Sequence, residues 1–152
     1  MSEITSENKK PTDNEICTYL SFLQGIIARM NANSMQCKLV CITLCAGLLA
    51  VYASMRGQNT CLILLLMVIV QMIFAYLDAR YLAMEKFFRK QYEENVENFQ
   101  AGELSRSKIF NIASPSPDFS CVEFMEALRS WSVWPVYALL LGAVFVLAAV
   151  KM

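Results

Sequence analysis

The chain contains no histidine and is poor in charge, because Asp, Glu, Lys and Arg make up only 17% of its 152 residues. An average soluble protein has about 25%. The absence of histidine removes the commonest general base and the commonest metal ligand. The 13 basic residues balance the 13 acidic residues, which argues against a protein that binds nucleic acid through bulk positive charge. We therefore expect no direct binding of nucleic acid.

Patterns typical of enzymes and cofactor sites are also missing from the sequence. The six cysteines include no C-x-x-C pair, which argues against a zinc site. There is no phosphate-binding glycine loop and no Ser/His/Asp set. We predict that the protein is not an enzyme and has no catalytic, cofactor-binding or metal-binding residues.

Hydrophobic residues, in contrast, make up 57% of the chain, above the 45–50% or so of a soluble domain. They are concentrated in three blocks, at residues 39–55, 61–77 and 132–150. A membrane-spanning helix needs roughly 17–25 apolar residues, and a chain of this length cannot wrap three such helices in polar layers. The blocks predict an all-α integral membrane protein in the lipid bilayer. Its spans form a transmembrane hairpin over 38–78 and a third, C-terminal transmembrane helix.

The basic residues are unevenly distributed around these blocks. All but two of the 13 lysines and arginines precede residue 39 or lie between the second and third blocks, and the exceptions are Arg56 and Lys151. Positively charged loops stay in the cytoplasm. We therefore expect a cytoplasmic N-terminus, with the hairpin tip and the C-terminus outside.

The segment before the first block carries an amphipathic pattern. Residues 1–11 are polar and are expected to form a flexible tail. Thr12 and Glu15 have the spacing of a capping box, which predicts a cytoplasmic amphipathic helix over 12–37. Its apolar stripe comprises Ile16, Leu20, Leu23, Ile27 and Met30. The stripe suits packing against the chain's own cytoplasmic helix, or against the membrane or a partner subunit.

Residues 79–131 are predicted to form a cytoplasmic helix, a loop and a short helix. The helix continues the second span and is supported by i,i+4 ion pairs, and Gly102 is expected to end it. Serine and proline mark the loop over 103–118, and Asp118 or Ser120 is placed to cap the short helix. The helix that continues the second span carries an apolar stripe, which comprises Tyr81, Met84, Phe88, Tyr92 and Phe99.

Three polar residues lie in or beside the second block. Gln71 is in its middle, and Asp78 and Arg80 directly follow it. Polar side chains inside a membrane are costly and usually face protein or water. One interpretation is a polar seam that lines an oligomeric pore. The other is hydrogen bonding between helices for Gln71, with solvation at the interface for Asp78 and Arg80.

Residues repeated at four-residue intervals in the first block predict helix packing. Small side chains at this spacing let helices approach closely in lipid, and here they are Ala46, Ala50 and Ser54. A second row, expected to pack as small apolar residues without a disulfide, is Cys37, Cys41 and Cys45. Three residues at the block ends are expected to anchor the chain at the membrane interface: Lys38, Trp131 and Trp134.

Three stretches combine aromatic and charged residues in a distinctive order. They are residues 19–30 (YLSFLQGIIARM) followed by Asn33, Ser34 and Lys38, residues 76–92 (YLDARYLAMEKFFRKQY), and residues 117–120 (PDFS). Together they resemble a group of small bacterial membrane proteins from anti-phage defence cassettes, and most of all the transmembrane effectors of retron systems. The likeness covers roughly residues 16–150. Such effectors are usually described as having two spans, whereas three apolar blocks predict three.

The resemblance implies a toxin-like effector of the bacterial inner membrane, with the C-terminus in the periplasm. A reverse transcriptase and its RNA–DNA product would hold it inactive, and phage interference with host DNA machinery would release it. Membrane damage would then stop the infected cell. Three spans cannot enclose a water path alone, so permeabilisation requires a homo-oligomer. The alternative function is a non-toxic membrane anchor that recruits soluble partners through residues 78–131.

Overall fold

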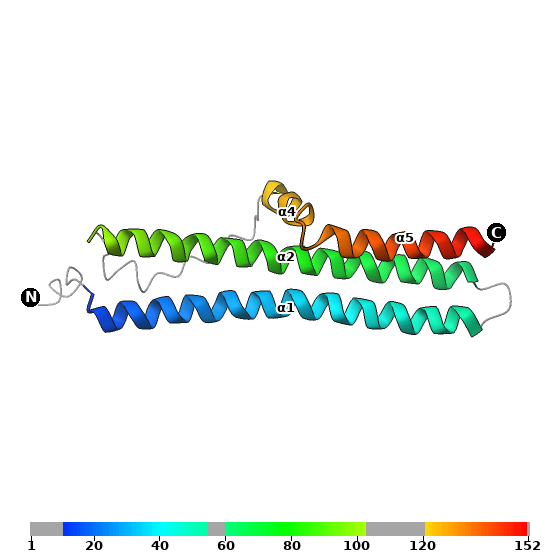
Figure 1. Ribbon diagram of the computed structural model, residues 1–152, viewed down its shortest axis with the longest axis horizontal. Coiled ribbons are helices and arrows are strands. Elements are labelled where there is room, and N and C mark those ends of the chain that lie inside the picture. Colours follow the sequence, from blue (N-terminus) through cyan, green and yellow to red (C-terminus); the bar gives the residue numbers. More distant parts are fainter. Residues whose placement is uncertain (1–10, 55–59, 103–120, 152) are drawn as a thin grey trace, which may run out of the picture. The chain divides into compact units, whose positions relative to one another are not determined.

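The computed structural model describes residues 11–54, 60–102 and 121–151, and every regular element in these ranges is a helix. The helices are α1 (Asp13–Ser54), α2 (Thr60–Gln100), α4 (Cys121–Leu128) and α5 (Trp134–Lys151) (Figure 1). The all-α prediction is confirmed for this part of the chain. The predicted N-terminal tail, hairpin tip and 103–118 loop fall outside the described residues, apart from the edges of the tail and the tip.

Helix α1 begins at the predicted capping box. The Thr12 N–H donates to the Glu15 carboxylate at 3.0 Å, and the Glu15 N–H donates to Thr12 Oγ1 at 3.4 Å. The helix then continues for 42 residues, so the segments predicted as a cytoplasmic helix over 12–37 and a span from 39 are one helix. Neither glycine nor proline occurs between residues 31 and 40, and nothing local interrupts the backbone hydrogen bonds there.

Helix α2 likewise runs past its apolar block and ends where Gly102 predicts. Gly102 has φ +72°, the left-handed conformation that glycine adopts at helix ends without steric cost. The N–H groups of Ala101 and Gly102 donate to the carbonyls of Glu97 and Phe99, each at 3.0 Å. Helix α5 begins at Trp134, two residues later than the predicted third span, because the preceding residues form a hydrogen-bonded turn.

The described residues fall into two compact units. The helix-pair unit contains residues 11–30 of α1 and 84–102 of α2, and the hairpin unit contains residues 31–54, 60–83 and 121–151. The units meet after residues 30 and 83, whereas the sequence predicts a transmembrane hairpin over 38–78. Lys38 and Asp78 pair with each other inside the hairpin unit.

The core of the helix-pair unit joins the two predicted apolar stripes. Ile16 and Leu23 of α1 are buried against Phe88 of α2, which confirms packing on the chain's own second helix. Tyr19, which the stripe omitted, is also buried there. Phe99, which the stripe included, is 43% exposed, because α2 ends one residue later.

Leu23→Ala is expected to destabilise the helix-pair unit by about 2–5 kcal/mol, because it leaves a cavity at a fully buried site. Amide hydrogen exchange of residues 13–30 and 84–100 should accelerate accordingly. Phe22→Ala, one residue away at a side chain that is 49% exposed, is the matched control and should change exchange little. Equal acceleration of hydrogen exchange in both variants would contradict the placement of Leu23 in the core of the helix-pair unit.

Alkaline pH is expected to weaken the same unit. Burial raises the pKa of Tyr19 above its ordinary value, and the hydrogen bond from Asn95 Nδ2 (3.4 Å) only partly offsets this. The unfolded chain therefore ionises Tyr19 before the folded chain does, so this contribution to stability is present below about pH 10 and is lost as the pH rises further. Tyr19→Phe should remove this loss of stability at alkaline pH. Helix content, measured by circular dichroism as the pH is raised, tests the prediction.

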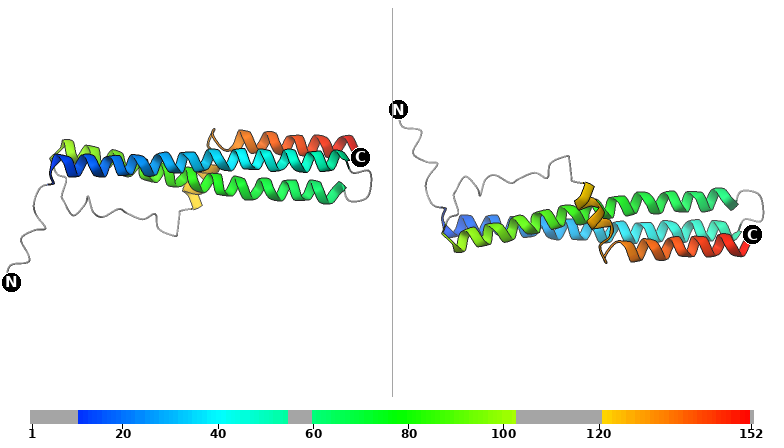
Figure 2. Two further views of the ribbon diagram at one scale, coloured as in Figure 1. Left: turned by 90° about the horizontal axis from the view of Figure 1, so that it is seen from below. Right: turned by 90° about the horizontal axis from the view of Figure 1, so that it is seen from above.

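The hairpin unit is built around a core between α1, α2 and α5, which lie side by side in both views of Figure 2. Cys41 and Cys45 of α1 are buried in it, which confirms the packing interpretation of these cysteines. Tyr52 Oη donates to the Leu147 carbonyl at 3.1 Å and joins α1 to α5.

The small residues of α1 do not pack within this chain. Ala46, Ala50 and Ser54 are all exposed, so the prediction that they contact a neighbouring helix is wrong for contacts inside one chain. The cysteine row occupies the inward face instead, because the polarisable thiols fill the contact without polar cost. Packing of the small residues against a second copy stays a prediction.

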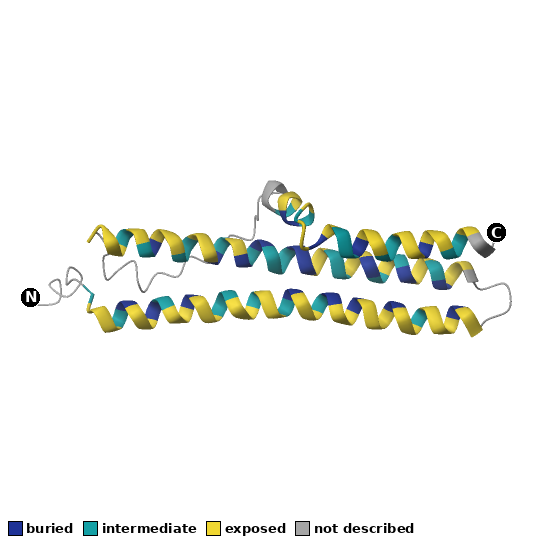
Figure 3. Ribbon diagram, viewed as in Figure 1, coloured by how far each residue is buried: buried dark blue, intermediate teal, exposed yellow. Residues whose placement is uncertain are grey.

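Most apolar side chains of the candidate spans face outward. In the most apolar windows of α1 and α2, only 28% and 17% of the residues are buried, and Figure 3 shows exposed residues along the outer side of each helix. A core helix of a soluble protein buries most of its apolar surface. These two helices are therefore long and apolar enough to cross a membrane, and they expose the surface that lipid would cover. Helix α5 is apolar but shorter.

Candidate functional site: a buried polar cluster

A cluster of polar side chains is buried inside the hairpin unit, between the middle and the inner end of the predicted second span. It comprises Ser34 and Lys38 of α1, Gln71 and Asp78 of α2, and Tyr137 of α5. Each is no more than 8% exposed. Ser34 and Lys38 are four residues apart and Gln71 and Asp78 are seven apart, so each pair lies on one helix face.

An ion pair forms the centre of the polar cluster. Lys38 Nζ lies 3.0 Å from Asp78 Oδ1 and 2.9 Å from Oδ2, and it also donates to Ser34 Oγ at 3.0 Å. Ser34 Oγ donates in turn to Asp78 Oδ1 at 2.5 Å. The Asp78 side chain is fully buried and that of Lys38 is 9% exposed. The ammonium is thus held by three oxygens and the two charges cancel.

This geometry corrects two sequence predictions. The sequence predicts Lys38 as an anchor at the membrane interface, and one of the two interpretations of Asp78 has it solvated there. Both are buried instead, because each charge offers the other a partner across the helix pair, and a paired charge is far cheaper to bury than a lone one. Ser34 was assigned no role, although its position one turn before Lys38 was the signal that could have indicated one.

One further member, Gln71, leaves a polar atom without a partner among the described residues. Gln71 Nε2 makes only a weak hydrogen bond to Cys45 Sγ, at 3.6 Å. Among the described residues, Gln71 Oε1 accepts no hydrogen bond. The Tyr137 side chain lies close to the Asp78 carboxylate. An unpaired buried polar atom costs about 1–3 kcal/mol, so the polar cluster is closed but not fully satisfied.

The remaining predicted site residues lie elsewhere. Arg80 is half-buried, but it follows Asp78 by two residues and so lies on a different face of α2. The seam of Gln71, Asp78 and Arg80 stays a prediction. Trp131 and Trp134 are 84% and 51% exposed, as interfacial anchors would be.

The chemistry available to the polar cluster is electrostatic. Its atoms supply one buried cation, one buried anion, two hydroxyl groups and an amide with an unpaired carbonyl oxygen, between apolar helices. Among residues 11–54, 60–102 and 121–151, no three or more Cys, Asp or Glu side chains gather as a metal site would require. The arrangement can hold helices together while dry and can accept water when they separate.

Comparisons with protein-family models, with curated proteins and with solved structures find no match to this chain.

Proposed function

We propose that the chain is a membrane effector of bacterial anti-phage defence, which permeabilises the inner membrane as a homo-oligomer and acts without catalytic chemistry. In this proposal α1 and α2 cross the bilayer as a hairpin, and α5 crosses as a third span. The N-terminus lies in the cytoplasm and the C-terminus in the periplasm. The sequence resemblance to retron effectors supports the defence role.

The buried polar cluster carries the proposal. Charged and amide side chains within membrane helices are expensive and commonly mark pathways for ions or water. The Lys38–Asp78 ion pair stabilises a closed hairpin unit in a single chain. Separation of the helices on assembly would expose Gln71, Asp78 and Tyr137 to one another across chains, and water would then pair the polar atoms that the closed state leaves unpaired.

The test is entry of a membrane-impermeant dye, together with a potential-sensitive dye, when the full chain is expressed alone in a bacterial host. We expect depolarisation soon after induction. A stop codon at position 39, which removes all three spans, is the control for the burden of expression. Intact membrane potential at high expression would overturn the proposal.

We also propose that a reverse transcriptase and its RNA–DNA product hold the effector inactive, as in the systems that the sequence resembles. The expected result is that co-expression of such neighbouring genes prevents depolarisation, and that a phage which disturbs host DNA metabolism restores it. Depolarisation that ignores the neighbouring genes would exclude this mode of control while leaving permeabilisation itself supported.

A second candidate function is a non-toxic anchor that recruits soluble partners through residues 78–131. The exposed ring of Phe99, together with the mixed charges of α2 around Lys90 and Glu94, favours it. Recovery of soluble partners with the tagged full chain, combined with unchanged membrane permeability, would support the anchor over the effector.

A further inference from the structure

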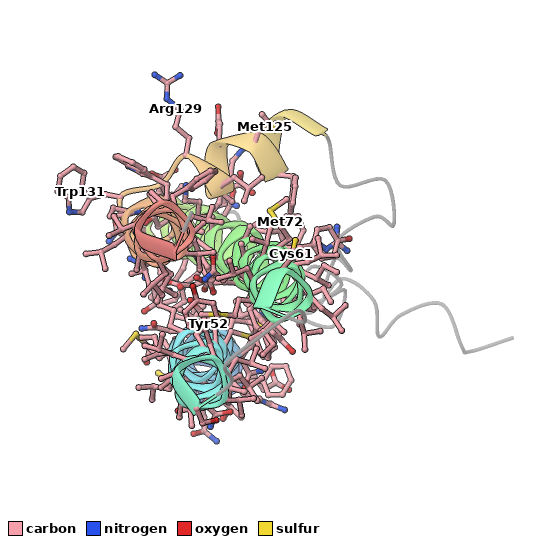
Figure 4. The ribbon with its side chains drawn as sticks, turned by 90° about the vertical axis from the view of Figure 1, so that its right-hand side faces the viewer. Tyr52, Cys61, Met72, Met125, Arg129 and Trp131 are labelled. Carbon is pink, nitrogen blue, oxygen red and sulfur yellow. The ribbon has the colours of Figure 1, made fainter. Side chains whose placement is uncertain are left out.

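The segment from α4 to the start of α5 presents bulky side chains outward, between neighbours whose side chains are buried. Met125, Trp131 and Trp134 are 58%, 84% and 51% exposed. Figure 4 shows Met125, Arg129 and Trp131 pointing away from the helices of the hairpin unit, in contrast to Tyr52, which points inward. Large exposed apolar side chains on an ordered segment commonly mark a binding surface.

Inward side chains fix this segment against the hairpin unit. Ala127 and Val133 are 0% and 1% exposed, and the Phe124 ring packs on Tyr76 of α2 with centroids 5.3 Å apart. The turn between the helices is hydrogen bonded, because the N–H groups of Val133 and Trp134 both donate to the Ser130 carbonyl, at 3.0 and 3.2 Å. The exposed side chains are thus held in place by their buried neighbours.

The same contacts place the segment at the end of the second apolar block. Tyr76 is the last residue but one of residues 61–77, and Tyr137, one turn into α5, lies close to Asp78 directly after that block. Helix α4 and the first turn of α5 are therefore level with the boundary between apolar and polar sequence. In a bilayer that level is the junction of acyl chains and headgroups, where tryptophan is enriched.

We propose that residues 124–134 form a membrane-interface element, which binds the headgroup boundary of the inner leaflet and holds the start of α5 at that depth. The exposed charges suit zwitterionic headgroups, because Glu126 and Arg129 are of opposite sign. The element would also compensate for the short length of α5. The 18 residues of α5 span about 27 Å, less than the hydrocarbon thickness of about 30 Å, and interfacial tryptophans secure a short span.

This inference rests on the membrane embedding in the proposed function but not on permeabilisation. The chain's only two tryptophans are Trp131 and Trp134, so its intrinsic tryptophan fluorescence reports this element alone. The experiment uses the full chain reconstituted in phosphatidylcholine vesicles and purified by flotation. Quenching is compared between lipids brominated near the glycerol end of the acyl chain, lipids brominated near the methyl end, and aqueous iodide. Trp131→Phe and Trp134→Phe resolve the two positions.

We expect both tryptophans to be quenched at least about twofold better by the shallow bromolipid than by the deep one, with weak quenching by iodide. Strong iodide quenching in chains that float with the vesicles would overturn the inference, since the element would then face water. Preferential deep quenching would overturn it as well, as would emission that no quencher reaches, the result for a protein partner. Chains that fail to float would overturn the embedding too, and dye release from the same vesicles tests permeabilisation separately.

Discussion

Asp78→Asn is expected to destabilise the hairpin unit by about 3–5 kcal/mol, because it leaves the Lys38 ammonium buried without a counter-charge. The asparagine carbonyl still accepts a hydrogen bond from Ser34, but it carries no charge to offset desolvation of Nζ. Unfolding of the detergent-solubilised chain by dodecyl sulfate, followed by circular dichroism, measures the loss.

Two further variants test whether the loss of stability comes from the buried ion pair. The double substitution Lys38→Met with Asp78→Leu removes both charges and should recover most of the lost stability, since an apolar pair of similar size is often neutral or better. Glu85→Gln is the matched control, because Glu85 is a second carboxylate of α2 that is paired with a cation. Its partner Arg89 is 58% exposed, so the cost should be only about 0–1 kcal/mol. Equal losses for Asp78→Asn and Glu85→Gln would contradict the buried pair.

Gln71→Leu is expected to separate stability from the proposed activity. It removes a buried carbonyl oxygen without a partner, so the hairpin unit should keep or gain stability. Dye entry should fall on the order of tenfold, because hydrating a leucine-lined constriction in place of an amide costs at least about 1–3 kcal/mol. Dye entry on induction and dodecyl sulfate unfolding of the same variant are the two measurements.

Gln91→Leu is the matched control for this substitution. Gln91 Oε1 is also buried without a partner among the described residues, but it belongs to the helix-pair unit. The chemical change is identical and lies outside the apolar blocks, so dye entry should be unchanged. Equal reduction by both variants would show that Gln71 has no special place in the permeation path.

The helices of this chain could be predicted well because local sequence rules determine them. The Thr12–Glu15 capping box marks the start of α1 and the glycine at position 102 marks the end of α2, and both signals depend on a few neighbouring residues. The continuity of α1 was missed because the change from an amphipathic to an apolar pattern near residue 38 resembles a boundary, although no residue there breaks a helix.

The polar cluster could be predicted only in part, because it depends on which faces of distant helices meet. Gln71 and Asp78 were identified by their rarity in apolar surroundings. Lys38 was given the opposite role, since a lysine at the end of a span extends to the interface unless a counter-ion lies opposite it. That counter-ion lies 40 residues away, and the face of α5 that brings Tyr137 near it has no sequence signal.

The packing surfaces of α1 show the same limit. The small-residue row and the cysteine row have the same spacing and differ in phase by one residue, so spacing alone cannot decide which row faces inward. The structure buries Cys41 and Cys45 and exposes Ala46 and Ala50. The exposed row would contact lipid or a second copy, and the periodicity is compatible with either.

The proposed function requires a bilayer that covers the outward apolar faces of α1 and α2. Alkaline carbonate extraction of membranes from cells that express the full chain, followed by density flotation, tests this directly. The account predicts that the whole chain stays with the lipid after extraction and needs detergent for release. Its recovery as a monodisperse protein in the carbonate supernatant, with no detergent present, would contradict the account.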